Sequence, residues 1–187
     1  TAGTASTTTY VVNADSTFTE VTGYQVKVNG NLVGVYNAGD SVYFDAPIEG
    51  AKYELAQNIG TNGGSSTAPV SVTITNTSAK YTVSTGDAKS GIINLVQVVE
   101  VTLPTGITAK YGASGSQTNT TVYIKVGTTL TLTGTNANGQ VIKAAVNGGS
   151  PAAITGGTAG DGASQAATAT WTLKNNESTV QFSQATP

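Results

Sequence analysis

The side chains that could do chemistry in this chain are ten acids, eight lysines and many hydroxyls, because histidine, cysteine, methionine and arginine are absent. Without histidine or cysteine, a hydrolase would have to activate a hydroxyl with a carboxylate or a lysine. The acids stand singly in predicted turns and on strand faces, whereas a glycosidase needs two carboxylates that flank one bond. The sequence therefore predicts a protein that is not an enzyme.

Metal and cofactor chemistry has equally little support in the sequence. The absence of cysteine excludes disulfides, zinc thiolate sites and thiol nucleophiles. Asp161, together with Asp40 or Asp87, is the one calcium alternative, but the D-x-D-x-D-G spacing of a calcium loop is missing. The glycine-rich segment 148–165 lacks the lysine and the following helix of a phosphate-binding loop. We expect no metal and no cofactor.

The overall charge and hydropathy exclude two classes of partner. Eight lysines against ten acids leave a net charge of -2, which is too weak to attract nucleic acid or an anionic membrane. Apolar residues make up 38% of the chain, enough for a folded core, yet no stretch of about 18 apolar residues could span a bilayer. We expect a folded protein with no nucleic-acid partner and no membrane-spanning segment.

The elements that carry these side chains are predicted to be strands. Threonine supplies 33 of the 187 residues, and its β-branched, uncharged side chain suits a pleated surface that faces water. Tyr24, Val26 and Val28 alternate with polar residues before an Asn29-Gly30 turn, which is typical of a β-hairpin. Because no segment sustains a period of about 3.6 residues, the predicted fold class is all-β.

Three blocks of the first half recur in the second half in the same order. Residues 36–47 match 123–134, residues 52–64 match 140–150, and residues 70–85 match 167–183. We interpret them as two tandem small antiparallel β-sandwich-like (Ig-like) modules at 22–86 and 92–187, joined by a linker at 87–91. The alternative is that all-β chains rich in threonine, glycine and asparagine look alike by composition.

Two segments are predicted to make contacts beyond a single module. Residues 92–103 carry aliphatic side chains on both faces, so Ile93, Leu95, Val99 and Val101 are expected in a central or interface strand that is covered on both sides. Residues 1–21 form a polar N-terminal extended arm whose apolar side chains are Tyr10, Val11, Val12 and Phe18. The arm would pair either within its own module or as a donor strand on the sheet edge of a neighbouring molecule.

The first module also resembles a known group of repeats. The segments VKVNGNLVGVYNAGDSVYFDAPIEGAKYELA (26–56) and VTITNTSAKYTVS (72–84) resemble the divergent β-repeats of bacterial surface proteins, related to the internalin B-repeat and often found beside S-layer homology domains. The resemblance covers roughly a third of the chain, and Leu55 stands where those repeats usually carry tryptophan. It implies a surface-exposed spacer, adhesive or assembly module, and no catalytic residues. A shorter match, PIEGAKYEL at 47–55, resembles the opening of collagen-adhesin B-type pilin modules.

These observations predict a non-enzymatic extracellular or cell-surface structural protein. It would be a self-assembling subunit or segment of a surface filament or surface layer, a homo-oligomer or homopolymer joined by β-strand edges. The alternative is a carbohydrate-binding or adhesin module that binds surface glycans through aromatic side chains. The candidate side chains are Trp171, Tyr24, Tyr36, Tyr43 and Tyr123. An internal Lys–Asn isopeptide or Thr–Gln ester bond formed beside a carboxylate is a further alternative, with Lys27 or Lys52 and Glu54 as participants.

Overall fold

The structure is a computed structural model that describes residues 7–113 and 116–187, and it confirms the all-β prediction. The first strands are β1 (Thr7–Val12), β2 (Phe18–Val28), β3 (Asn31–Tyr36), β4 (Ser41–Asp45), β5 (Lys52–Leu55), β6 (Gly64–Ser65), β7 (Val72–Thr75) and β8 (Ser78–Thr82). They are followed by β9 (Ile92–Leu103), β10 (Thr108–Lys110), β11 (Thr120–Lys125), β12 (Thr129–Thr133), β13 (Val141–Val146), β14 (Ala152–Ala153), β15 (Thr168–Thr172) and β16 (Thr179–Ala185). Two 3-10 turns, η1 (Ala56–Asn58) and η2 (Thr85–Asp87), complete the described elements.

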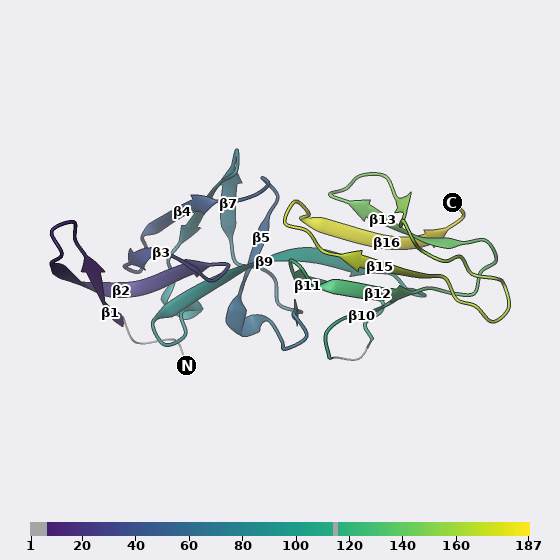
Figure 1. Ribbon diagram of the computed structural model, residues 1–187, viewed down its shortest axis with the longest axis horizontal. Coiled ribbons are helices and arrows are strands. Elements are labelled where there is room, and N and C mark those ends of the chain that lie inside the picture. The colour runs from purple at the N-terminus through teal and green to yellow at the C-terminus, as the bar shows by residue number, and fades with distance from the viewer. Residues whose placement is uncertain (1–6, 114–115) are drawn as a thin grey trace.

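Strand β9 runs through the middle of the molecule and is paired on both edges (Figure 1). On one edge β2 pairs with residues 92–95 and β11 pairs with residues 98–103. On the other edge β5 pairs with residues 95–98 and β16 pairs with residues 100–102. β9 is twelve residues long and pairs with these four strands, so it connects the two ends of the large sheet.

Two smaller sheets pack on the large sheet and enclose two separate cores. Sheet β4-β8-β7 covers a cluster that includes Val26, Tyr53, Ile93 and Leu95, and we call this half the first sandwich. Sheet β10-β12-β15 covers a cluster that includes Val99, Val101, Ile124 and Phe182, which we call the second sandwich. The packing passes from one core to the other inside β9, between Leu95 and Val99, whereas the sequence placed the boundary at the 87–91 linker. Residues 87–91 form the turn that leads from η2 into β9.

The two sandwiches repeat the same register in their smaller sheets. The N–H groups of Gly39 and Gly127 donate to the carbonyls of Val83 and Leu173, both at 2.8 Å. Both glycines lie at positive φ, 89° and 91°, where a side chain would be strained. From these turns β4 pairs with β8 as β12 pairs with β15, five residue pairs in each case. The first block matched in the sequence thus occupies the same position in both sandwiches.

The second matched block also coincides in space, but the third does not. Strands β5 and β13 lie at corresponding edges, where the carbonyls of Tyr53 and Ile142 accept the N–H groups of Val70 and Ile154. The third match set residues 70–85 against 167–183 and so aligned β8 with β16. This alignment is wrong, because β8 lies in a smaller sheet and corresponds to β15, whereas β16 lies in the large sheet and corresponds to β9.

Two of the pairings are parallel, which the expectation of antiparallel modules missed. Strand β2 runs parallel to β9, and β9 runs parallel to β16. The N–H of Gln25 donates to Gly91 O and the N–H of Glu100 donates to Ser178 O, so Gln25 corresponds to Glu100. Strand β9 is therefore the last strand of the first sandwich and the first strand of the second. The sequence shows hairpins, but a parallel pair is joined through a crossover that leaves no local signal.

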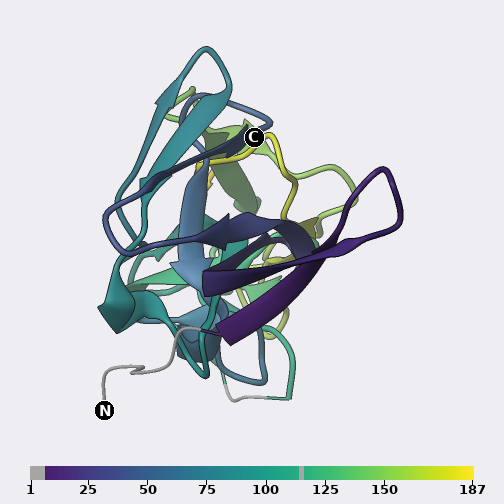
Figure 2. The same ribbon diagram turned by 90° about the vertical axis from the view of Figure 1, so that its left-hand side faces the viewer.

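From Thr7 onward, β1 and the first half of β2 form a hairpin that projects from the end of the molecule (Figures 1 and 2), while residues 1–6 of the expected arm lie outside the described residues. β1 pairs antiparallel with the first half of β2, from Thr7↔Gly23 to Val12↔Phe18. β2 crosses the boundary expected at residues 21 and 22 and continues into the first sandwich, where it pairs with β3 and β9. The arm and the first sandwich thus share one continuous strand.

Candidate functional site

Most carboxylates in the described part of the chain stabilise turns or ion pairs. Asp161 Oδ1 accepts the N–H groups of Ala163, Ser164 and Gln165, and these bonds lower the pKa of Asp161. Asp40 accepts the N–H of Asn37, and Asp15 accepts both the hydroxyl and the N–H of Thr17. Across residues 7–113 and 116–187, no group of three or more acidic side chains gathers in a way that could hold a metal ion. Asp15, Asp40 and Asp161 thus fix the backbone of their turns.

One acid is fully buried at the junction of the two sandwiches. Glu54 has no exposed surface, and its Oε1 accepts Leu55 N–H at 2.7 Å and Asn58 Nδ2 at 3.1 Å. Its Oε2 accepts the Ser65 hydroxyl at 3.3 Å. Ser65 belongs to β6, which pairs with β11 of the second sandwich. Glu54 therefore fixes a loop that connects the two cores, with its oxygens bound by three donors.

Corresponding aromatic residues are hydrogen-bonded to an acid in both sandwiches. Tyr81 in β8 donates its hydroxyl to Asp87, and Trp171 in β15 donates its indole N–H to Glu177 at 3.3 Å. Each acid follows its aromatic partner by six residues. Burial raises the pKa of Tyr81, and the hydrogen bond and charge of Asp87 raise it further. Both pairs stabilise the chain where it leaves a smaller sheet for the large one.

The raised pKa of Tyr81 predicts a loss of stability in alkali. The folded protein favours the protonated phenol, so this contribution is complete below the ordinary tyrosine pKa of about 10 and is lost as the pH rises above it. We expect the denaturant midpoint of the protein to fall from about pH 10 to about pH 12. The midpoint of the Tyr81→Phe variant should fall less over the same interval. It should still fall in part, because burial raises the pKa of Tyr53 and Tyr111 as well. Equal slopes for the two proteins would contradict this assignment.

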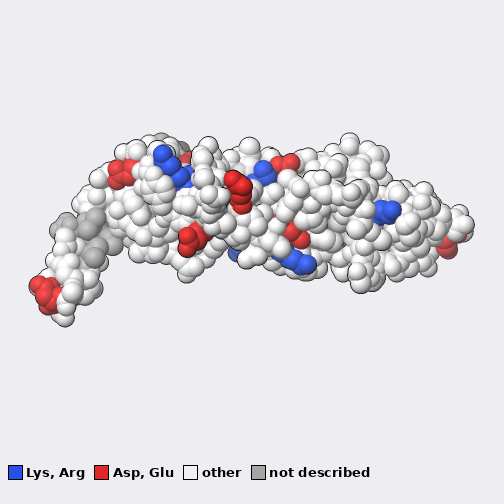
Figure 3. Space-filling view, turned by 90° about the horizontal axis from the view of Figure 1, so that it is seen from above, with Lys and Arg blue, Asp and Glu red and all other residues white. Residues whose placement is uncertain are grey.

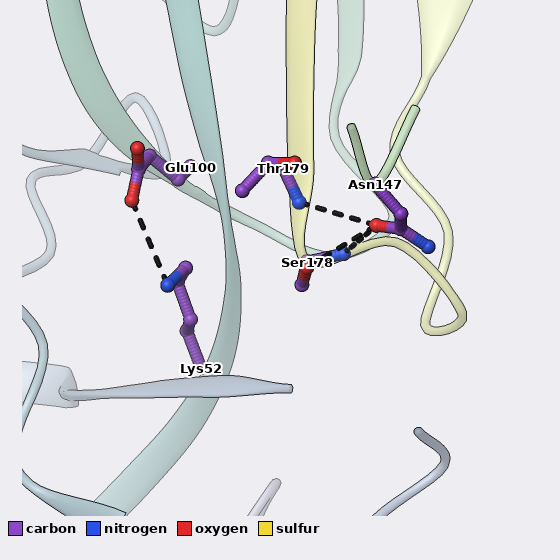
Figure 4. Close-up of polar contacts among 5 residues, drawn as sticks. All are labelled: Lys52, Glu100, Asn147, Ser178 and Thr179. Carbon is purple, nitrogen blue, oxygen red and sulfur yellow. Dashed lines mark hydrogen bonds and ion pairs between the residues drawn. The ribbon is translucent and has the colours of Figure 1, made fainter. Parts of the chain in front are cut away.

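An ion pair joins the sandwiches on the large sheet, and further polar contacts lie nearby within the second sandwich (Figure 4). Lys52 of β5 forms an ion pair with Glu100 of β9, with an Nζ to Oε2 distance of 3.6 Å. Nearby, Asn147 Oδ1 accepts the N–H groups of Ser178 and Thr179 at the start of β16. Lys52 therefore points to Glu100, while the Glu54 carboxylate binds other donors, so Lys52 is not placed beside this carboxylate for an isopeptide bond. Lys27, the other lysine considered, lies on β2.

The predicted interface strand is fully buried along one face, and the predicted arm is exposed. The expectation of cover on both sides is wrong, because Ile92 and Val96 on the other face of β9 are only half-buried. Ile93, Leu95, Val99 and Val101 each have 0% exposed surface, two in each core. On the hairpin, Tyr10, Val12 and Phe18 are 63%, 64% and 69% exposed. Val11 lies in β1, but its side chain lies outside the described residues.

These exposed side chains share one face of the hairpin. Val12 is directly opposite Phe18, and Tyr10 stands two residues before Val12 in β1. Directly opposed residues of an antiparallel pair lie on the same face, as do residues two apart in a strand. The hairpin thus presents an aromatic and aliphatic face to solvent.

A second surface feature is a groove in the second sandwich. It encloses about 600 Å³ between the β13–β14 edge and β15, and Ala152, Ile154, Thr170, Trp171 and Lys174 line it. Lys174 Nζ lies 5.9 Å from the centre of the Trp171 ring, and Trp171 also packs edge-on against Phe182. The sequence did not indicate this groove, because it forms where two sheets separate.

The aromatic side chains proposed from the sequence as one platform are distributed over different sheets. Tyr24, Tyr36 and Tyr43 belong to the first sandwich, with Tyr24 directly opposite Tyr36 in the large sheet and Tyr43 on β4. Tyr123 lies on β11 of the second sandwich, whereas Trp171 lies on β15 in the smaller sheet. Trp171 alone of this set lines the groove.

Charge is sparse over the visible surface, and an acidic group marks the tip of the hairpin (Figure 3). That tip carries Asp15, which is exposed, and the groove carries Lys174. No helix among the described residues has the length and apolar character to cross a membrane.

Comparison of this chain with protein-family models, with curated proteins and with solved structures found no match.

Proposed function

We propose that this chain is a non-enzymatic structural segment of an extracellular filament or surface layer. The single observation that supports this most is the shared strand β9, which makes the two sandwiches one continuous body. Main-chain pairing on both edges of β9 joins the two sandwiches more firmly than a flexible linker would, which suits a segment that transmits load. The resemblance to repeats of bacterial surface proteins agrees with this role.

The surface chemistry supports the same proposal. A net charge of -2 and scarce lysine provide few of the charged side chains that keep exposed strand edges apart. Asp40 and Asp161 are bound to turns and Glu100 to an ion pair, which argues for rigidity in place of acid–base chemistry. Assembly of copies through strand edges is the activity that these features permit.

Electron microscopy and sedimentation of the purified chain test this proposal. We expect ordered polymers whose fraction rises with protein concentration. Deletion of residues 1–20 should leave both sandwiches folded, since pairing of β2 with β3 and β9 begins at Tyr24 and Gln25, but should stop polymerisation. A truncated chain that assembles like the intact one would contradict a role for the arm, and an intact chain that stays monomeric at all concentrations would contradict the proposal itself.

A carbohydrate-binding role is the second candidate, and the groove at Trp171 is the observation that favours it. An aromatic ring beside a lysine in a groove of about 600 Å³ can stack on a sugar and bind its hydroxyls. Trp171 is the single tryptophan of the chain, so glycan binding should change its fluorescence. A dispersed monomer whose Trp171 emission titrates with a glycan would favour this role over assembly.

A further inference from the structure

The hairpin repeats the strand pairing of one part of the first sandwich. Counting back along both strands from Gln25 and its counterpart Glu100, Gly23 corresponds to Val98 and Phe18 to Ile93. β1 then pairs with β2 where β5 pairs with β9, because Thr7↔Gly23 matches Lys52↔Val98. The hairpin is therefore equivalent to the β5–β9 pair of the first sandwich.

The equivalent positions differ sharply in burial. Phe18 corresponds to Ile93, which has no exposed surface, yet Phe18 is 69% exposed. Tyr10 corresponds to Leu55, which is 6% exposed, yet Tyr10 is 63% exposed. In the first sandwich the smaller sheet covers these positions with Val42, Tyr81 and other apolar side chains. The hairpin thus carries a core-facing surface without its covering sheet.

The second sandwich also differs from the first beside β15, where the groove lies. In the first sandwich β7 pairs with β8 over four positions, from Thr75↔Ser78 to Val72↔Tyr81. In the second sandwich the corresponding segment, residues 154–158, pairs with β15 at Thr158↔Thr168. It then turns away at Gly156 and Gly157 and leaves residues 170–172 facing the groove. The groove occupies the place where a strand equivalent to β7 would lie.

We propose that the hairpin of one molecule docks in this groove on a second copy of the chain. The first half of β2 would add a strand beside residues 170–172 of β15, as β7 does beside β8. Phe18 would then pack against Trp171 and Ile154 of the second copy, and Asp15 would approach Lys174. This inference rests on the proposed assembly function and names the two surfaces that form the contact.

The shape of the molecule makes the contact intermolecular. The hairpin lies at one end and β13 and β15 lie in the opposite half, so a molecule cannot fill its own groove (Figure 1). A contact between two different surfaces of identical molecules leaves one free hairpin and one free groove on every dimer. Repetition builds an open filament when the rotation between copies does not close a ring, and the filament is the form that agrees with a strand-sharing rod.

Disulfide trapping tests the contact directly, because the chain has no cysteine of its own. Val12→Cys places a thiol on the hairpin face, and Ala153→Cys places one at the groove, where Ala153 is exposed. Mixing the two full-length variants under mild oxidation should give a disulfide-linked heterodimer. The matched control pairs Tyr43→Cys, 61% exposed on β4, with Ala153→Cys, and should give at least about tenfold less heterodimer.

Charge substitutions test the same surfaces in solution. Phe18→Asp and Ala153→Asp should each weaken self-association about 30-fold, the loss expected when an interface anchor is removed. Each variant keeps one intact surface, so an equal mixture should form dimers without longer polymers. Tyr43→Asp should associate like the unmodified chain.

The outcomes separate this inference from the proposed function. If the chain polymerises but the Val12→Cys and Ala153→Cys variants give no more heterodimer than the control pair, the hairpin and groove do not form the contact, and assembly uses other edges. A specific heterodimer without polymers supports the contact and overturns the filament. If neither polymers nor a specific heterodimer form, and a glycan quenches Trp171, both proposals are wrong and the groove is a carbohydrate site.

Discussion

Replacing Leu95 by alanine is expected to destabilise the second sandwich, although Leu95 lies in the core of the first. Truncation of a fully buried leucine usually costs about 2–5 kcal/mol of unfolding free energy. Leu95 has 0% exposed surface and belongs to β9, whose next residues enter the second core at Val99. Because β9 supplies side chains to both cores, weaker packing of its first half should also weaken the strand pairing of its second half.

The single tryptophan makes this measurable. Trp171 lies in the second sandwich, so its fluorescence during denaturant unfolding reports the half of the molecule that the mutation does not touch. We expect the Trp171 midpoint to fall together with the loss of far-UV circular dichroism in one cooperative transition. Leu32→Ala is the control, since Leu32 is 54% exposed and its truncation should cost less than about 0.5 kcal/mol. An unchanged Trp171 midpoint in Leu95→Ala would mean that the sandwiches unfold independently.

Glu54→Ala should cost about 3 kcal/mol of stability, since it leaves buried donors without an acceptor. Leu55 N–H, the Asn58 amide and the Ser65 hydroxyl all bind the Glu54 carboxylate. Their loss should free the loop that carries β6 to its pairing with β11. Chemical denaturation followed by Trp171 fluorescence would measure the change, and hydrogen exchange at residues 56–65 would show whether the loop opens first.

Glu54→Gln is the matched control for this prediction. Its amide oxygen can still accept from Leu55 and Asn58, and its amide nitrogen can donate to Ser65 Oγ. We expect it to retain most of the stability, with a loss below about 1.5 kcal/mol. Equal losses for the alanine and glutamine variants would show that the hydrogen bonds are not what Glu54 contributes.

Much of the secondary structure could be predicted from local patterns. The alternation at Tyr24, Val26 and Val28 coincides with β2, and the matched blocks 36–47 and 123–134 contain β4 and β12. The paired glycine turns at Gly39 and Gly127 explain why the first repeated block was visible: a positive φ and an alternating strand both leave a mark in the sequence. The third block failed because β8 and β16 have similar alternation but belong to different sheets.

The sequence indicated the apolar residues of the hairpin but not the groove. Exposed apolar residues in a polar arm stand out by composition, so Tyr10, Val12 and Phe18 could be singled out. The groove left no such signal, because the residues around Trp171 come from β13, β14 and β15 and meet only after the sheets have packed. The groove forms because residues 154–158 pair with β15 at one position, whereas β7 pairs with β8 over four positions.

By itself, the sequence determined that this chain would be all-β, weakly charged and without the side chains of common catalytic sites, since these properties follow from residue type and from spacing along one strand. The tertiary structure decided which strands are neighbours, and with that the role of residues 92–103. Their aliphatic side chains on both faces predicted burial. Only the parallel pairing of β9 with β2 and β16 made β9 the shared strand of two cores, because a parallel neighbour is chosen by long-range packing and not by the local chain.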